Sequence, residues 1–184
     1  MDNTSIRNQQ TEEAKTAVGG YLLTWGQLES RLASDFHNIA PHRRGPHIDP
    51  KDISKTLAHL ARQWAKEVKK NVPASSREAD DLVEEIISAA GHRNTICHGW
   101  QGVITGEDIV EWNIVCWHKF NEVRSTGQFP AQRLFGRSFL EKLTDETKAF
   151  RLRVKSLTES AQIEREKVRV PEESIFRQTP ARPE

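Results

Sequence analysis

The spacing of apolar residues predicts helices along most of the chain. From about Thr11 to Ala40, apolar side chains recur at steps of three and four, which is the spacing of one helical face. Pro41 ends this helix, because proline disfavours the helical conformation of the residue before it. The first predicted helix therefore carries one apolar stripe, made of Ala14, Val18, Leu22, Trp25, Leu28, Leu32 and Phe36.

Two further helices are predicted before residue 100. After a loop at 41–50, Asp49-Pro50 has the pattern of an N-cap followed by proline at the first helical position. The second helix then carries Ile53, Leu57, Leu60, Trp64 and Val68 on one face. Ser75 and Glu78 form a capping-box pattern that predicts the start of the third helix. Its inward residues are Ala79, Leu82, Ile86 and Ala90, flanked by Val83 and Ile87, and it continues to about Cys97, where Gly99 suits a left-handed turn.

The pattern changes to that of a β-hairpin after residue 99. Residues 100–104 predict a short strand, 105–108 a turn, and 110–116 a strand in which apolar and polar residues alternate. Residues 121–136 are expected to be loop, and Ser138 with Glu141 forms a second capping box. The last helix has a narrow apolar seam at alternating steps of three and four, which could pack within the chain or against a second copy. Its members are Leu140, Leu143, Thr147, Phe150, Val154, Leu157 and Ala161.

These elements predict a mainly α fold, namely an up-and-down four-helix bundle with a β-hairpin inserted before the last helix. A chain of 184 residues is enough for one domain with a sizeable core. We expect a flexible N-terminus at 1–10, a single helical domain at 11–168 with the hairpin at about 100–120, and a disordered tail at 169–184, which is rich in proline and polar residues.

Composition narrows the class of protein. The chain is 36% hydrophobic and 29% charged, and no stretch approaches the roughly 18 apolar residues that a membrane span needs. Two cysteines without a CxxC pair argue against a disulfide framework or a cysteine-rich zinc site. A cytoplasmic protein without a membrane partner, metal or cofactor is therefore expected.

The net charge of +1 conceals a basic segment. Residues 42–71 contain eight basic and three acidic residues, a local charge of +5. Arg43, Arg44, Lys51 and Lys55 are the candidate RNA contacts in this segment, because a basic surface suits a polyanion. The alternative is that these residues form the solvated faces of a loop and a helix.

The densest group of chemically capable side chains is the stretch HRNTICHGW at 92–100. Arg93 stays protonated and offers a planar fork to a phosphate, while His98 can carry a proton in either direction near neutral pH. Asn94, four residues before His98, can hold a ribose, a phosphate or the ring. This set suits attack by a ribose 2′-hydroxyl on its phosphate, which needs acid–base help but no metal. A single histidine cannot be both base and acid, so a second copy in a symmetric dimer would supply the partner group.

The neighbours of the pair carry more information than its spacing. Arg31 and His37 have a similar spacing within the first predicted helix, and we interpret them as a chance match. Arg93 and His98 are accompanied by Asn94, Ile96 and Gly99 at a helix end. This neighbourhood resembles the HEPN family (higher eukaryotic and prokaryotic nucleotide-binding domains), whose signature is an arginine, often a polar residue directly after it, and a histidine four to six positions later. The phrase WGQLE at 25–29 also looks like helix one of bacterial members, with Glu29 facing inward.

The resemblance implies a helical homodimer with both motifs in one cleft. For active members it implies metal-independent RNA cleavage that leaves a 2′,3′-cyclic phosphate, with Arg93 on the scissile phosphate, His98 handling the proton and Asn94 orienting ribose or phosphate. Glu29 and Trp100 would support the site. Toxin members paired with a small nucleotidyltransferase often have a tyrosine two residues after the histidine, where this chain has Trp100, so that route of regulation is not expected. The expected function is an endoribonuclease of a toxin or phage-defence system, with RNA or a nucleotide as ligand and an antitoxin protein as a candidate partner.

Two other interpretations remain open. In one, the same cleft binds nucleotide, RNA or a protein without cleavage. In the other, Arg93 pairs with Glu29, Glu84 or Glu85, His98 caps the helix end, and the hairpin and last helix form a protein-interaction surface. The tryptophans are core residues by default, because each buries a large area, although one on the hairpin could stack on a base. His42 and His47 show no diagnostic metal spacing.

Overall fold

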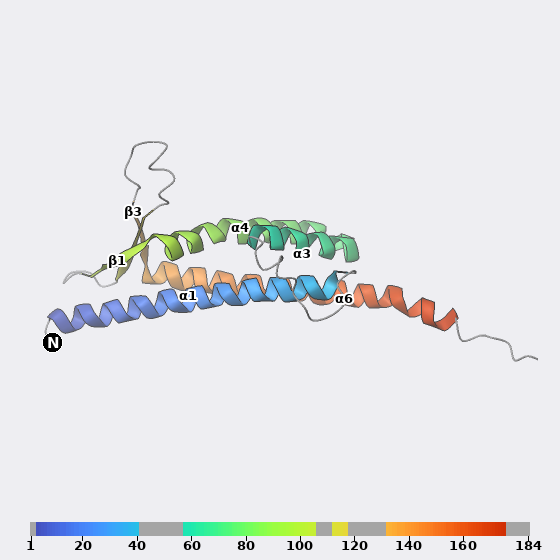
Figure 1. Ribbon diagram of the computed structural model, residues 1–184, viewed down its shortest axis with the longest axis horizontal. Coiled ribbons are helices and arrows are strands. Elements are labelled where there is room, and N and C mark those ends of the chain that lie inside the picture. Colours follow the sequence, from blue (N-terminus) through green and yellow to red (C-terminus); the bar gives the residue numbers. More distant parts are fainter. Residues whose placement is uncertain (1–2, 41–56, 106–111, 118–131, 176–184) are drawn as a thin grey trace, which may run out of the picture. The chain divides into compact units, whose positions relative to one another are not determined.

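The computed structural model describes residues 3–40, 57–105, 112–117 and 132–175 (Figure 1). Within these residues the helices are α1 (Asn3–Ile39), α3 (Leu57–Asn71), α4 (Ser76–Gly99) and α6 (Arg137–Ile175), with a short 3-10 turn at Pro73–Ser75. The strands are β1 (Trp100–Ile104), β2 (Asn113–Trp117) and β3 (Gln132–Gly136). The predicted mainly α fold, with a hairpin before the last helix, is therefore confirmed.

The chain divides into two compact units. Unit 1 comprises Met1–Ser30 and Glu84–Arg151, and unit 2 comprises Arg31–Val83 and Leu152–Glu184. The three boundaries cross α1, α4 and α6, so each of these helices contributes to both units. The range predicted as a single domain thus contains two compact units.

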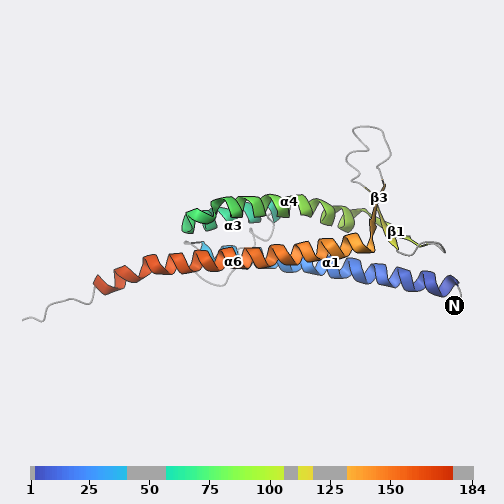
Figure 2. The same cartoon turned by 180° about the vertical axis from the view of Figure 1, so that it is seen from behind.

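In unit 1, α1 and α6 run side by side and in the same direction (Figures 1 and 2). Arg137 at the start of α6 lies 3.8 Å from Glu13, and Arg151 donates a hydrogen bond to Gln27. From the first pair to the second, the position on α1 and the position on α6 increase by the same number of residues. The two helix axes are therefore parallel. A strictly alternating bundle would make its first and last helices antiparallel, so the helix directions differ from that prediction.

The sheet is antiparallel and has the order β1-β2-β3. β1 has the predicted bounds, whereas β2 begins at Asn113, and the predicted turn at 106–108 lies outside the described residues. The prediction of loop up to Gly136 is wrong for β3. Its residue Phe135 pairs with Ile114 of β2, and both side chains are buried. Pairing with a neighbouring strand, which local pattern does not reveal, makes this segment a strand.

Both long helices extend past their predicted ends. Residues 3–10, predicted as flexible, are helical, and the Thr11 hydroxyl donates to the Arg7 carbonyl at 2.9 Å. Residues 169–175, predicted as disordered, continue α6. Proline removes one backbone donor, so a helix can pass Pro171 at the cost of one hydrogen bond. The predicted start of the second helix at Asp49-Pro50 lies outside the described residues, as does the tail after 175.

The predicted apolar stripes are the core. Every member of the α6 seam is buried, from Leu140 through Thr147 to Ala161. This seam therefore packs within the chain and is not free to bind a second copy. The α1 stripe is buried except for half-buried Leu22, and the inward residues Ala79, Leu82 and Ile86 of α4 are 0% exposed.

Unit 2 has its own core around Trp64. The indole N–H of Trp64 donates to the hydroxyl of Thr158 at 2.9 Å, and both residues are buried. Nearby polar groups on α1 are also paired, since Arg31 lies 2.7 Å from the buried carboxylate of Asp35. Burial raises the pKa of Asp35 above its usual value, and the hydrogen bond from Arg31 opposes this rise.

We predict that Trp64→Phe lowers the free energy of unfolding by about 1–3 kcal/mol, because it removes the hydrogen bond to Thr158 and part of a buried ring. Urea unfolding measures this loss. Arg62→Ala, at an exposed position of the same helix, serves as the control and should change stability by less than about 0.5 kcal/mol. Equal stability of the two variants would contradict the assigned role of Trp64.

Candidate functional site

The stretch singled out by sequence lies at the C-terminal end of α4 in unit 1. The helix continues through Gly99 and leads directly into β1 at Trp100. Ile96 is buried, and the hydroxyl of buried Thr95 donates to the Gly91 carbonyl at 2.9 Å. These contacts fix which sides of the last turns face the core, and so they fix where Arg93 and His98 lie.

Arg93 takes a position on the inward side of α4. It lies seven residues after Ile86, which returns to nearly the same side of a helix. Its Nη2 is 3.6 Å from Oε1 of Glu29 on α1, and its Nη1 donates to the Asn94 side-chain oxygen at 3.1 Å. Its Nε is buried without a hydrogen-bond partner, although 29% of the side chain is exposed. The guanidinium is therefore oriented by two neighbours and still has an unused donor.

His98 is exposed and lies on another side of the same helix. Five residues separate it from Arg93, which corresponds to about 140° around the helix axis and roughly 7.5 Å along it. Within the described part of the chain, no hydrogen bond or ion pair joins the two side chains. Asn94, by contrast, is four residues from His98 and on the same side. One copy of the chain therefore joins Glu29, Arg93 and Asn94 through their side chains. His98 shares a side of the helix with Asn94 but not with Arg93.

Two residues beside Arg93 were given no role by the sequence. Tyr21 is fully buried on α1, and its ring contacts Trp25 edge-on with 6.3 Å between centroids. Burial raises the pKa of Tyr21 to about 12, and the Trp25 indole and the positive charge of Arg93 oppose the rise. His92 packs edge-on against Phe135 and Phe139, at centroid distances of 6.2 and 5.5 Å. Tyr21 lies three residues after Val18 and four before Trp25, so the apolar spacing of α1 could have found it, but Leu22, which is half-buried, was assigned to the stripe in its place.

The remaining predicted site residues are only partly placed. Arg43, Arg44, Lys51 and Lys55 lie outside the described residues. Trp100 is the first residue of β1, where it pairs with Cys116 of β2. Arg31, which belongs to the pair interpreted as a chance match, has a structural contact, because it forms an ion pair with Asp35 within α1.

The described residues also contain a hollow and two free thiols. A hollow of about 430 Å³ lies between the N-terminal part of α1, the start of α6 and Trp112, and none of the motif residues lines it. No group of three or more His, Cys, Asp or Glu side chains that could hold a metal ion occurs in the described ranges. Cys97 is exposed and Cys116 buried, and both are free thiols.

None of the described helices combines the length and the apolar character needed to cross a membrane. Comparison of the chain with protein-family models, with curated proteins and with solved structures gave no match.

The buried position of Tyr21 can be tested directly, because it is the only tyrosine of the chain. We predict that tyrosinate absorbance titrates near pH 12 in the folded protein and near 10.0 in denaturant. The folded pKa is raised, so the contribution of Tyr21 to stability is complete below pH 10 and is lost as pH rises towards 12. Over this pH range, the Tyr21→Phe variant should lose less free energy of unfolding than the wild type, by up to about 2 kcal/mol. A folded-state midpoint near 10 would contradict the burial.

Proposed function

We propose that this chain is an RNA-binding helical module in which Arg93 contacts a backbone phosphate. The observation that carries this proposal is the state of the guanidinium. It is partly exposed, and its ion pair with Glu29 is long at 3.6 Å. A guanidinium fork can bind a phosphate with two hydrogen bonds, and such charge-assisted bonds are stronger than neutral ones.

Glu29 and Asn94 have distinct roles in this proposal. Glu29, whose side chain is 38% exposed, holds the guanidinium in place while no ligand is bound, and a phosphate then competes for the same N–H groups. Asn94 uses its oxygen to accept from Arg93, so its amide N–H groups face the ligand as donors to ribose or phosphate. His98, on the other side of α4, would contact a different nucleotide of the same strand.

Binding without cleavage follows from the separation of Arg93 and His98. General acid–base catalysis requires the proton-transferring group within hydrogen-bond reach of the atoms that react. Side chains about 140° apart on one helix are directed to different sides of it. In one copy, the two residues therefore suit binding along a strand better than reaction at one bond.

The second candidate function is the metal-independent endoribonuclease that the HEPN resemblance implies, leaving a 2′,3′-cyclic phosphate in a toxin or phage-defence setting. The observation that favours it is the exposure of His98 at the end of α4. It requires a homodimer in which the His98 of one copy approaches the Arg93 of the other. An antitoxin protein would be its regulatory partner. We propose the cytoplasm as the location for either function, in keeping with two free thiols.

We predict that Arg93→Ala weakens binding of a fluorescently labelled single-stranded RNA by about tenfold or more, and that Arg93→Lys has an intermediate effect because lysine keeps the charge but not the fork. Fluorescence anisotropy at several salt concentrations measures both, and the salt slope should decrease by about one for Arg93→Ala. Arg77→Ala is the matched control, since Arg77 lies on the same helix with a side chain that is 95% exposed. Equal affinity of Arg93→Ala and Arg77→Ala would contradict the proposal.

The choice between binding and cleavage needs a second assay. We predict that the wild-type protein leaves RNA intact in EDTA at concentrations that saturate binding. Product bands with 2′,3′-cyclic ends that disappear in His98→Ala would instead establish the endoribonuclease. Circular dichroism of His98→Ala should match the wild type, because the side chain is exposed.

A further inference from the structure

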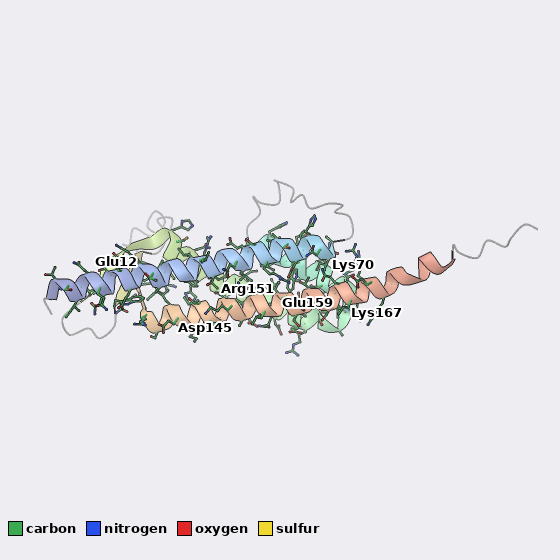
Figure 3. The ribbon with its side chains drawn as sticks, turned by 90° about the horizontal axis from the view of Figure 1, so that it is seen from below. Glu12, Lys70, Asp145, Arg151, Glu159 and Lys167 are labelled. Carbon is green, nitrogen blue, oxygen red and sulfur yellow. The ribbon has the colours of Figure 1, made fainter. Side chains whose placement is uncertain are left out.

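The C-terminal half of α4 and the described strands of the sheet contain no acidic residue. Residues 86–105, which include the last turns of α4 and all of β1, have no Asp or Glu, and neither do residues 112–117 and 132–136. By contrast, α6 carries both acidic and basic side chains along its length, among them Asp145, Arg151, Glu159 and Lys167 (Figure 3). A polyanion that approaches the end of α4 and these strands therefore meets no carboxylate on them.

Arg133 of β3 is an exposed arginine at this end of the sheet. It pairs with Cys116 of β2, which in turn pairs with Trp100, the residue that directly follows α4. Neighbouring strands lie about 4.8 Å apart, so the Cα atom of Arg133 is roughly 10 Å from that of Trp100. Because Trp100 is two residues after His98, the sheet register places Arg133 beside the C-terminal end of α4.

The side chain of Arg133 leaves β3 on the face of the sheet that packs against α4. Alternate residues of a strand share a face, so Arg133 shares one with Phe135. Phe135 is buried and contacts the ring of His92 on α4. Arg133 remains exposed, and no hydrogen bond or ion pair joins it to another residue in the described part of the chain. It is therefore a second arginine near the end of α4, in addition to Arg93.

The two arginines lie on different flanks of α4. Consecutive residues of a helix are about 100° apart around its axis. Arg93 faces Glu29 of α1, whereas His92 faces the sheet through Phe135. The guanidinium of Arg93 is therefore directed away from the sheet face that carries Arg133, and the two groups are suited to different phosphates of one strand.

We infer that an RNA strand bound at Arg93 continues around the last turn of α4 to Arg133, which contacts a second phosphate. This inference rests on the proposed RNA-binding function. Between the two arginines α4 exposes Cys97 and His98, and Asn94 is half-buried, so the path has no negative side chain. Basic groups that follow the backbone in this way are typical of proteins that bind a single strand without reading its sequence.

Fluorescence anisotropy with a labelled single-stranded RNA tests the role of Arg133. Arg133→Ala should weaken binding about tenfold, because it removes charge-assisted hydrogen bonds to a phosphate, and should lower the salt slope by about one. Its Tm should match the wild type, since the side chain is exposed. Arg137→Ala is the matched control. It removes the same charge just after the other end of β3, where Arg137 lies 2.9 Å from Glu141, and it should bind RNA as the wild type does. Wild-type affinity of Arg133→Ala, or an equal loss in Arg137→Ala, would overturn the inference.

The double variant tests whether the two arginines contact separate phosphates. Losses of binding free energy add for independent contacts, so the Kd of Arg93→Ala with Arg133→Ala should rise by the product of the two single factors. A double variant that binds no more weakly than Arg93→Ala would overturn the inference. The single variants also separate the two proposals. Weakened binding in Arg93→Ala with normal binding in Arg133→Ala would reject only the second phosphate contact, whereas normal binding in both would reject the proposed function itself.

Discussion

The structure depends on one constraint: each long helix buries a single apolar stripe within the chain. This burial is the main source of stability, since isolated helices gain little from backbone hydrogen bonds alone. It also sets the rotation of each helix about its own axis. Once Leu82 and Ile86 of α4 are buried, the direction of every other side chain on that helix is determined. The positions of Arg93 and His98 are thus a consequence of core packing.

That rotation places Arg93 and His98 on different sides of α4. Arg93 follows the buried stripe and reaches Glu29 across unit 1, whereas His98 is directed to solvent. An arginine on an inward position needs partners, because a buried charge without compensation is costly. Glu29 and Asn94 supply them and leave the guanidinium partly exposed. The same three residues therefore stabilise the local packing, and this structural role is compatible with the proposed contact of Arg93 with a phosphate.

The surfaces of α6 and α1 differ. The α6 seam has the regular spacing that favours helix pairing, and it is used within the chain. On α1, residues 16–28 carry no charge, and Leu23, on the side opposite the buried stripe, is 65% exposed.

The sequence by itself determined the helices, their inward faces and the bounds of β1, because apolar spacing and capping residues act over a few neighbouring positions. It also located the group at 93–98, because arginine, asparagine and histidine occur together there at a predicted helix end. The tertiary structure alone decided that β3 is a strand, that α1 and α6 are parallel, and that Tyr21 is buried next to the motif. Only the tertiary structure pairs Arg93 with Glu29 and directs His98 to solvent. These features depend on contacts between residues far apart in the chain, and local spacing carries no information about which distant surface a side chain will meet.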